Sequence, residues 1–188
     1  GGVGGRVEGL KGTAQFARYV LGGQGRKWSS DNLYRLSTRV SRSFIRVDAD
    51  EVTYPAHVIL RYRLERAMID GDLAAKELPG AWADGLKQLL GVAPADDSKG
   101  CLQDIHWYCG MWGYSPTYTI GALAAAQFFA TATREETGKE AGLAAEDFTP
   151  LMRSLRAKVQ GLGARYTPNE SVKKGTGRAM CPTAFKTE

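Results

Sequence analysis

The chain has 188 residues, of which 43% are hydrophobic, so it is long enough to build one core and too apolar for a disordered protein. Its 25 Lys and Arg against 20 Asp and Glu give a net charge of +5. The basic residues are scattered among acidic ones, which predicts a solvated surface rather than a nucleic-acid site. No apolar run approaches the ~18 residues that cross a bilayer, so we expect no membrane span.

The cysteines Cys101, Cys109 and Cys181 are odd in number and widely spaced, which favours free thiols in an intracellular, reducing compartment. The chain opens at Gly1 rather than at Met, and with the basic balance this is compatible with a removed targeting peptide. A mitochondrion or a plastid is compatible with this interpretation. A metal site of Cys101, His106 and Cys109 would have only three ligands at an unusual spacing, so no metal is expected.

The first 28 residues are rich in glycine and are predicted to be an N-terminal extension, with a short helix at 13–21. Residues 29–188 are predicted to form the helical domain. Behind capping candidates at 29–31, apolar residues follow one another at intervals of three and four, which predicts one amphipathic helix that ends near Arg46. These residues are Leu33, Leu36, Val40, Phe44 and Val47.

Further helices are expected at 53–70, closed by Gly71, and from Pro79 to Gly91, followed by a loop at 92–100. Pro116 begins a long helix to about residue 134, rich in small residues that allow close packing, and another helix is predicted at 149–162. Residues 167–170 have the form of a capping box and begin a last short helix. Because strand signals are nearly absent, the predicted class is all-α, a helical bundle.

Two short stretches carry a recognisable pattern: Ile-Arg-Val-Asp-Ala-Asp at 45–50 and Gly-Cys-Leu-Gln-Asp-Ile-His-Trp at 100–107. They resemble the IRxxAD and GxxQDxHW motifs of the Taq-type carboxypeptidases, which are HExxH zinc metallopeptidases. The resemblance covers about 33–129 and, more weakly, 148–185, and implies the carboxyl-terminal part of such an enzyme. The sequence contains no HExxH. Zinc is the cofactor of the family, but no cofactor is expected on this chain.

Arg46 suits the recognition of a free peptide carboxylate, because a guanidinium can bind a carboxylate through two parallel hydrogen bonds. Asp48 and Asp50 are candidates to orient it. The alternative is an ordinary arginine at a helix end, paired with neighbouring acids.

Polar residues Gln103, Asp104 and His106 precede an aromatic cluster, which is typical of a shaped pocket. The cluster comprises Trp107, Tyr108, Trp112, Tyr114 and Tyr118. The resemblance implies that Gln103 and His106 line the substrate groove. It also implies that a tyrosine, Tyr114 or Tyr118, donates a hydrogen bond to the peptide carbonyl. Without the resemblance, His106 and the aromatic residues would be read as structural, and the other histidine, His57, is expected to pack inside its helix.

Three functions remain open. The absence of the HExxH half favours the first, a non-catalytic accessory or structural subunit of a larger assembly, for which an organellar complex is one host, with other protein subunits as partners. The second is the substrate-binding C-terminal part of an active zinc carboxypeptidase whose HExxH half lies on another chain or outside the known sequence. The third is a free-standing module that binds a peptide C-terminus.

Overall fold

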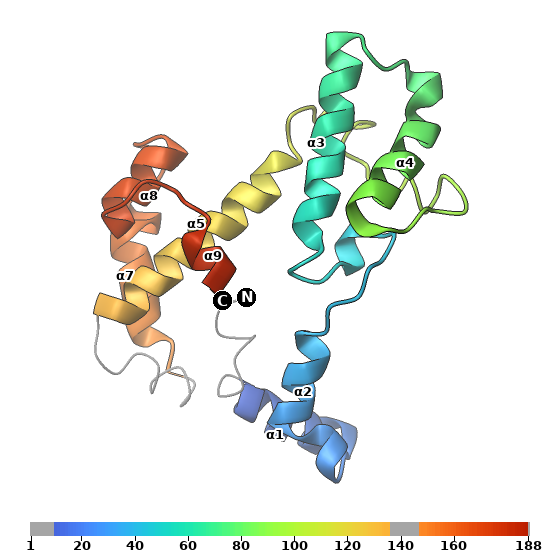
Figure 1. Ribbon diagram of the computed structural model, residues 1–188. Coiled ribbons are helices and arrows are strands. Elements are labelled where there is room, and N and C mark those ends of the chain that lie inside the picture. Colours follow the sequence, from blue (N-terminus) through green and yellow to red (C-terminus); the bar gives the residue numbers. More distant parts are fainter. Residues whose placement is uncertain (1–9, 136–146, 188) are drawn as a thin grey trace. The chain divides into compact units, whose positions relative to one another are not determined.

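The computed structural model describes residues 10–135 and 147–187. In these two ranges the chain forms α-helices and short 3-10 helices without strands, which confirms the predicted all-α class (Figure 1). None of these helices is both long and apolar enough to cross a membrane. The chain divides into two compact units, one of residues Arg39–Ile120 and one of Gly1–Thr38 with Gly121–Glu188. The predicted boundary between an extension, 1–28, and a domain, 29–188, stays a prediction.

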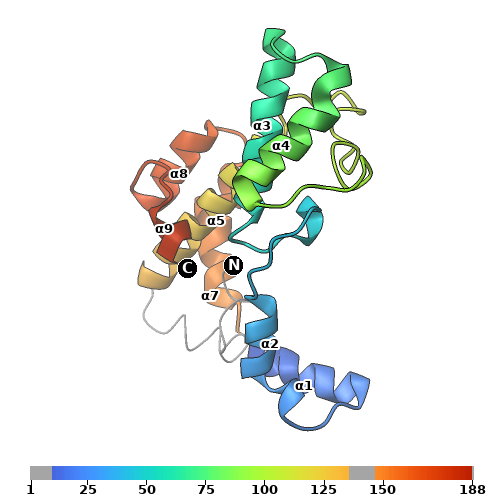
Figure 2. The same ribbon diagram turned by 45° about the vertical axis from the view of Figure 1, so that its right-hand side comes forward.

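The unit of residues 39–120 is built on two helices, α3 (Tyr54–Asp70) and α4 (Leu78–Leu90), with η4 (Ala75–Glu77) between them. The two helices lie side by side in both views (Figures 1 and 2). Apolar residues at spacings of three and four give each helix one buried face. The core they form contains Leu60, Leu64, Trp82, Leu86, Leu90 and Cys101. As predicted, α3 ends at Gly71 and α4 at Gly91, which take the left-handed φ values of 84° and 71°.

Gly85, in the middle of α4, allows this close packing. A Cβ atom at this position would overlap Cδ1 of Leu60 on α3, and Leu60 is only 2% exposed. Glycine weakens a helix by about 1 kcal/mol relative to alanine. A larger residue at this position would not fit, because α3 and α4 approach each other closely at Gly85.

The helix predicted at 31–46 is wrong beyond residue 37. The structure ends α2 (Ser30–Ser37) at Thr38, whose hydroxyl donates a 2.8 Å hydrogen bond back to the carbonyl of Tyr34. The next residues run without regular structure to η3 (Arg46–Asp48), and the Ser41 N–H donates to the Asp50 carboxylate instead of to a helix carbonyl. Serine and β-branched residues in this stretch compete with helix formation, so the apolar spacing was misleading.

In the other unit, α1 (Leu10–Leu21) packs on α2, with η2 (Arg26–Trp28) between them in the chain. Its remaining helices are α5 (Pro116–Glu135, from Gly121 on), α7 (Thr149–Lys158), α8 (Pro168–Thr176) and α9 (Thr183–Thr187). The predicted helix 149–162 is thus shorter and is followed by η5 (Gln160–Leu162). The predicted capping box is confirmed, because Thr167 and Glu170 each bind the other's backbone N–H.

A buried glutamine joins α5 to the segment that follows α8. The amide nitrogen of Gln127, which is 1% exposed, donates to the Thr176 hydroxyl at 2.9 Å and to the Ala179 carbonyl at 3.1 Å. Its oxygen accepts from the Cys181 N–H at 3.1 Å. Gly175 lies so close to the ring of Phe128 that a Cβ atom would overlap it, so α8 packs tightly on α5.

Candidate functional site

Asp104 binds two arginines from different elements of the unit 39–120. Its carboxylate accepts from Arg46, on η3, through Nη2 at 2.8 Å and Nε at 3.2 Å, and from Nε of Arg61, on α3. The side chains of Arg46, Arg61 and Asp104 are only 7%, 2% and 14% exposed. Asp104 therefore forms a buried double ion pair with them.

Gln103, the neighbour of Asp104, completes this group. Its side-chain oxygen accepts from the backbone N–H of Arg46 at 2.9 Å and from Nη2 of Arg61 at 2.8 Å. Its amide nitrogen donates to the carbonyl of Phe44 at 3.0 Å. The two motifs at 45–50 and 100–107 thus meet around Arg61, and we call Arg46, Arg61, Gln103 and Asp104 the arginine cluster.

The arginine cluster holds more positive than negative charge, because two guanidiniums share one carboxylate. Burial opposes ionisation of Asp104, but its hydrogen bond with Arg46 and the charge of Arg61 outweigh this and lower its pKa. Burial likewise opposes the positive charge of Arg46. The hydrogen bond and the negative charge of Asp104 have a larger effect together, so the pKa of Arg46 is raised. Burial lowers the pKa of Arg61, but an arginine side chain stays protonated at neutral pH. All three groups are therefore charged at pH 7, and the cluster carries one surplus positive charge.

Aromatic side chains form a wall beside Arg46. Its guanidinium carbon lies 4.6 Å from the ring centre of Tyr118, and its Nη1 donates to the Tyr54 hydroxyl at 2.7 Å. Nε2 of His106 lies 2.9 Å from the Tyr118 hydroxyl, and the His106 ring stacks on Tyr114 at 5.3 Å. Both candidate donor tyrosines, Tyr114 and Tyr118, therefore lie next to His106, and Tyr118 also contacts Arg46.

The two acids proposed to orient Arg46 lie elsewhere. Asp50 accepts from the backbone N–H groups of Ser41, at 2.8 Å, and of Thr53, at 2.9 Å, so it holds the turn before α3. Burial alone would raise the pKa of Asp50, but the hydrogen bonds to its carboxylate have a larger effect together and lower it. Asp48 is exposed, and Asp104 takes the orienting position.

A buried glutamate on α3 was missed by sequence reasoning. Glu65, 5% exposed, accepts from Nε1 of Trp107 at 2.7 Å and from the backbone N–H of Gly113. It therefore fixes the loop that leads into Tyr114. Glu65, Arg61 and His57 recur at intervals of four between apolar core residues, and this pattern is the signal that could have revealed them.

His57 is fully buried on α3, as the sequence predicted, and neither of its ring nitrogens has a hydrogen-bond partner among the described residues. Burial, followed by the positive charges of Arg61 and Arg46, lowers its pKa to about 4. The imidazole is therefore neutral at pH 7, chiefly because it is buried, and the charges of Arg61 and Arg46 add to this effect.

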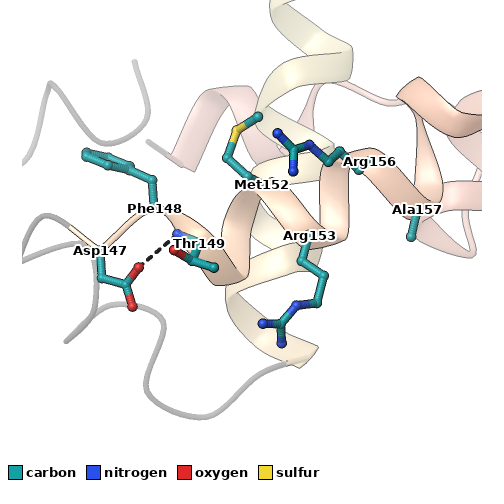
Figure 3. A pocket seen from close by; sticks show the side chains of 7 residues that line it. All are labelled: Asp147, Phe148, Thr149, Met152, Arg153, Arg156 and Ala157. Carbon is teal, nitrogen blue, oxygen red and sulfur yellow. Dashed lines mark hydrogen bonds between the residues drawn. The ribbon is translucent and has the colours of Figure 1, made fainter.

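A surface hollow of about 780 Å³ lies over the beginning of α7. Figure 3 shows its lining, which comes from this helix and the two residues before it: Asp147, Phe148, Thr149, Met152, Arg153, Arg156 and Ala157. In Figure 3 the side chains of Arg153 and Arg156 point in different directions. They do not converge on one position where a ligand would bind, so this hollow is not the candidate site.

Within the described residues the protein is all-helical, and both sequence motifs meet at a buried arginine cluster. The family model for the carboxypeptidase Taq (M32) metallopeptidases matches residues 10–188, and the chain belongs to this family. It is 45% identical to thermostable carboxypeptidase 1 of Thermus thermophilus over 146 residues, which are 78% of this chain and 29% of the relative. With thermostable carboxypeptidase 1 of Pyrococcus furiosus it shares 40% identity over 153 residues, or 81% and 31% of the two chains.

Solved structures show the same relation. Trypanosoma cruzi metallocarboxypeptidase 1 superimposes with a TM-score of 0.91 at 34% identity, over 98% of this chain and 39% of that one. The M32 carboxypeptidase of Deinococcus radiodurans gives 0.88 at 38% identity, over 98% and 37%. The chain thus spans about a third of the length of the relatives that it matches.

The metal implied by this family finds no fitting ligands in the part of the chain that the structure describes. Within 10–135 and 147–187, no three His, Cys, Asp or Glu side chains are grouped so that they could hold a metal ion. Of the three residues considered from the sequence, Cys101 lies buried in the core, His106 bonds to Tyr118 and Cys109 is exposed.

Proposed function

We propose that this chain provides the substrate-binding, C-terminal part of a zinc metallocarboxypeptidase, and that its arginine cluster receives the free carboxylate of a peptide. The observation that carries this proposal is the double ion pair, in which two buried guanidiniums share the single carboxylate of Asp104. A buried surplus charge is costly unless it is paired. The carboxylate of a peptide would neutralise it.

Arg46 has the hydrogen-bonding capacity for this role. Three of its five N–H groups are used, by Asp104 at Nε and Nη2 and by the Tyr54 hydroxyl at Nη1. One further N–H remains on each of Nη1 and Nη2. A peptide carboxylate could accept from both, which is the paired geometry that arginine favours.

Tyr118 is the better of the two candidate carbonyl donors. Its ring lies over the Arg46 guanidinium, whereas Tyr114 reaches that region only through His106 and Tyr118. A hydroxyl held here could donate to the carbonyl oxygen of the last peptide bond as negative charge develops on it. In this proposal, zinc binding and water activation belong to the remaining part of the enzyme, which this chain does not cover.

A chimera tests the proposal. Residues 10–188 would replace the matching third of the Thermus thermophilus carboxypeptidase, whose remaining part would supply the rest of the enzyme. We expect the chimera to remove C-terminal residues from free-acid peptides, and the variant Arg46→Lys to raise KM because lysine cannot form the paired contact. Arg66→Lys, in an exposed pair with Asp70, is the matched control. A folded, metal-loaded chimera without activity would reject the proposal.

The second candidate is the accessory or structural subunit of a larger assembly. Exposed apolar side chains on one face of α3 favour a protein partner: Ile59 is 41% exposed, Tyr62 46% and Ile69 62%. A folded but inactive chimera, together with a protein that co-purifies with the natural chain and is lost in Ile69→Asp, would support this candidate instead.

A further inference from the structure

A small cavity lies inside the unit 39–120, and several of the residues that line it carry polar groups. Its volume is about 10 Å³, and its lining includes Trp82, Asp104, His106 and Ser115. A volume of roughly 10–15 Å³ accommodates one water molecule when two to four polar groups can bind it.

Two ring nitrogens of residues that line this cavity are buried and lack a hydrogen-bond partner within the described ranges. They are Nε1 of Trp82, a residue 1% exposed, and Nδ1 of His106, a residue 8% exposed. Leaving a buried polar group unpaired costs about 1–3 kcal/mol. Arg61, Asp104 and Ser115 also line the cavity, and among them the Asp104 carboxylate can accept hydrogen bonds beyond those of its arginines.

We propose that this cavity binds one water molecule, which accepts a hydrogen bond from Nε1 of Trp82 and donates to Nδ1 of His106 and to Asp104. The direction follows from the chemistry of the groups. The indole N–H can only donate and the carboxylate can only accept, so the water receives from Trp82 and gives to Asp104. Its second hydrogen then goes to Nδ1 of His106.

This arrangement selects one tautomer of His106. If Nδ1 accepts from the water, the proton of the neutral ring sits on Nε2, which then donates to the Tyr118 hydroxyl oxygen 2.9 Å away. The hydroxyl hydrogen of Tyr118 is thereby left for another acceptor. Trp82 and His106 are thus positioning residues for Tyr118. That an incoming peptide carbonyl uses this hydrogen rests on the proposed function, whereas the water and the tautomer do not.

Nuclear magnetic resonance of the ¹⁵N-labelled 188-residue protein, without peptide, tests the inference. The chain has two histidines, so the variant His106→Gln assigns the ring signals. At pH 8 we expect the two-bond nitrogen–proton couplings of His106 to show the Nε2–H tautomer. We also expect a cross-peak between the Trp82 indole proton and a long-lived water.

Two outcomes would overturn the inference. A dominant Nδ1–H tautomer would show that the hydrogen bonds run in the opposite direction. The lack of a water cross-peak at the Trp82 indole would show that no long-lived water is bound in the cavity. Trp112→Phe serves as the control for indole assignment, because Trp112 is 48% exposed. Both readouts come from the wild-type protein in the absence of peptide, so they separate this inference from the proposed function.

Discussion

The carboxylate of Asp104 binds the guanidinium of Arg46, 58 residues earlier in the chain, at 2.8 Å. This contact joins the two sequence motifs, and Arg61 on α3 shares the same carboxylate. One acidic side chain thus holds η3, α3 and the loop after α4 together. Because two guanidiniums share this one carboxylate, the cluster keeps one unbalanced positive charge. In the proposed function, the carboxylate of a peptide neutralises this charge.

Asp104→Asn should be strongly destabilising. It would leave two buried guanidiniums facing a neutral amide, and breaking a buried pair in this way costs about 3–5 kcal/mol. Asp70→Asn is the matched control, because Asp70 pairs with Arg66 at 3.1 Å with side chains 46% and 60% exposed. For it we expect a loss of less than about 0.5 kcal/mol in urea denaturation. Equal losses for the two variants would contradict the double ion pair.

The free energy of unfolding should fall as pH drops from about 6.5 to about 4. His57 stays neutral in the folded protein until its pKa of about 4 is reached. The unfolded chain takes up the same proton below about pH 6.5, so the unfolded state binds more protons and stability is lost as pH falls. The 2.5-unit difference between these pKa values corresponds to about 3 kcal/mol.

His57→Leu should remove this part of the pH dependence, as measured by urea denaturation at several pH values. Asp104 does not interfere in this window. Its pKa lies below the ordinary value of about 3.9, so its stabilisation is lost only as pH falls below about 4. An unchanged slope between pH 6 and 4 in the variant would show that His57 is not the group that titrates.

The close approach at Gly85 predicts opposite effects for two alanine substitutions in one helix. Gly80→Ala meets open space and should stabilise α4 by up to about 1 kcal/mol. Gly85→Ala gains the same helix propensity but overlaps the buried Leu60, and overpacking costs about 1–3 kcal/mol. Thermal unfolding should therefore place Gly85→Ala below Gly80→Ala by about 2 kcal/mol, and the reverse order would disprove the close contact.

Glu65→Gln should loosen the loop at 107–113. Glutamine keeps one acceptor oxygen, whereas Glu65 serves two donors, Trp107 and Gly113, so one buried N–H would lose its partner. The expected loss is about 1–3 kcal/mol. Glu77→Gln, whose exposed side chain accepts only from the Ala74 N–H, should change stability by less than about 0.5 kcal/mol. Hydrogen exchange at Gly113 should rise in Glu65→Gln alone.

The helices could be predicted from the sequence where capping and stop residues agreed with apolar spacing. Gly71 and Gly91 end α3 and α4 as expected, and Thr167 and Glu170 cap α8 as expected. The failure at 38–46 arose because spacing alone was used. Asp50, from beyond the stretch, binds the Ser41 backbone and holds this segment out of a helix, and such a contact is invisible to periodicity.

The site was predictable in part. The motifs named Arg46, Gln103, Asp104 and His106, and the structure brings the first three into direct contact. The scattered basic residues predict a solvated surface, and Arg61 is an exception to this prediction because it is only 2% exposed. Local sequence favoured Asp48 and Asp50 because they are near Arg46 in the chain. The acid that orients Arg46 is Asp104, and only the path of the chain between the two motifs reveals this contact.

The most direct test of the central claim is a calorimetric comparison of two peptides that differ only at the C-terminus, one a free acid and one an amide, binding to the purified chain. A charged hydrogen bond contributes about 1.5–3 kcal/mol, so the free acid should bind about 10- to 100-fold more tightly. Arg46→Lys should reduce this preference, whereas Arg66→Lys should not. Equal affinity for the two peptides would contradict the claim that the arginine cluster receives a peptide carboxylate.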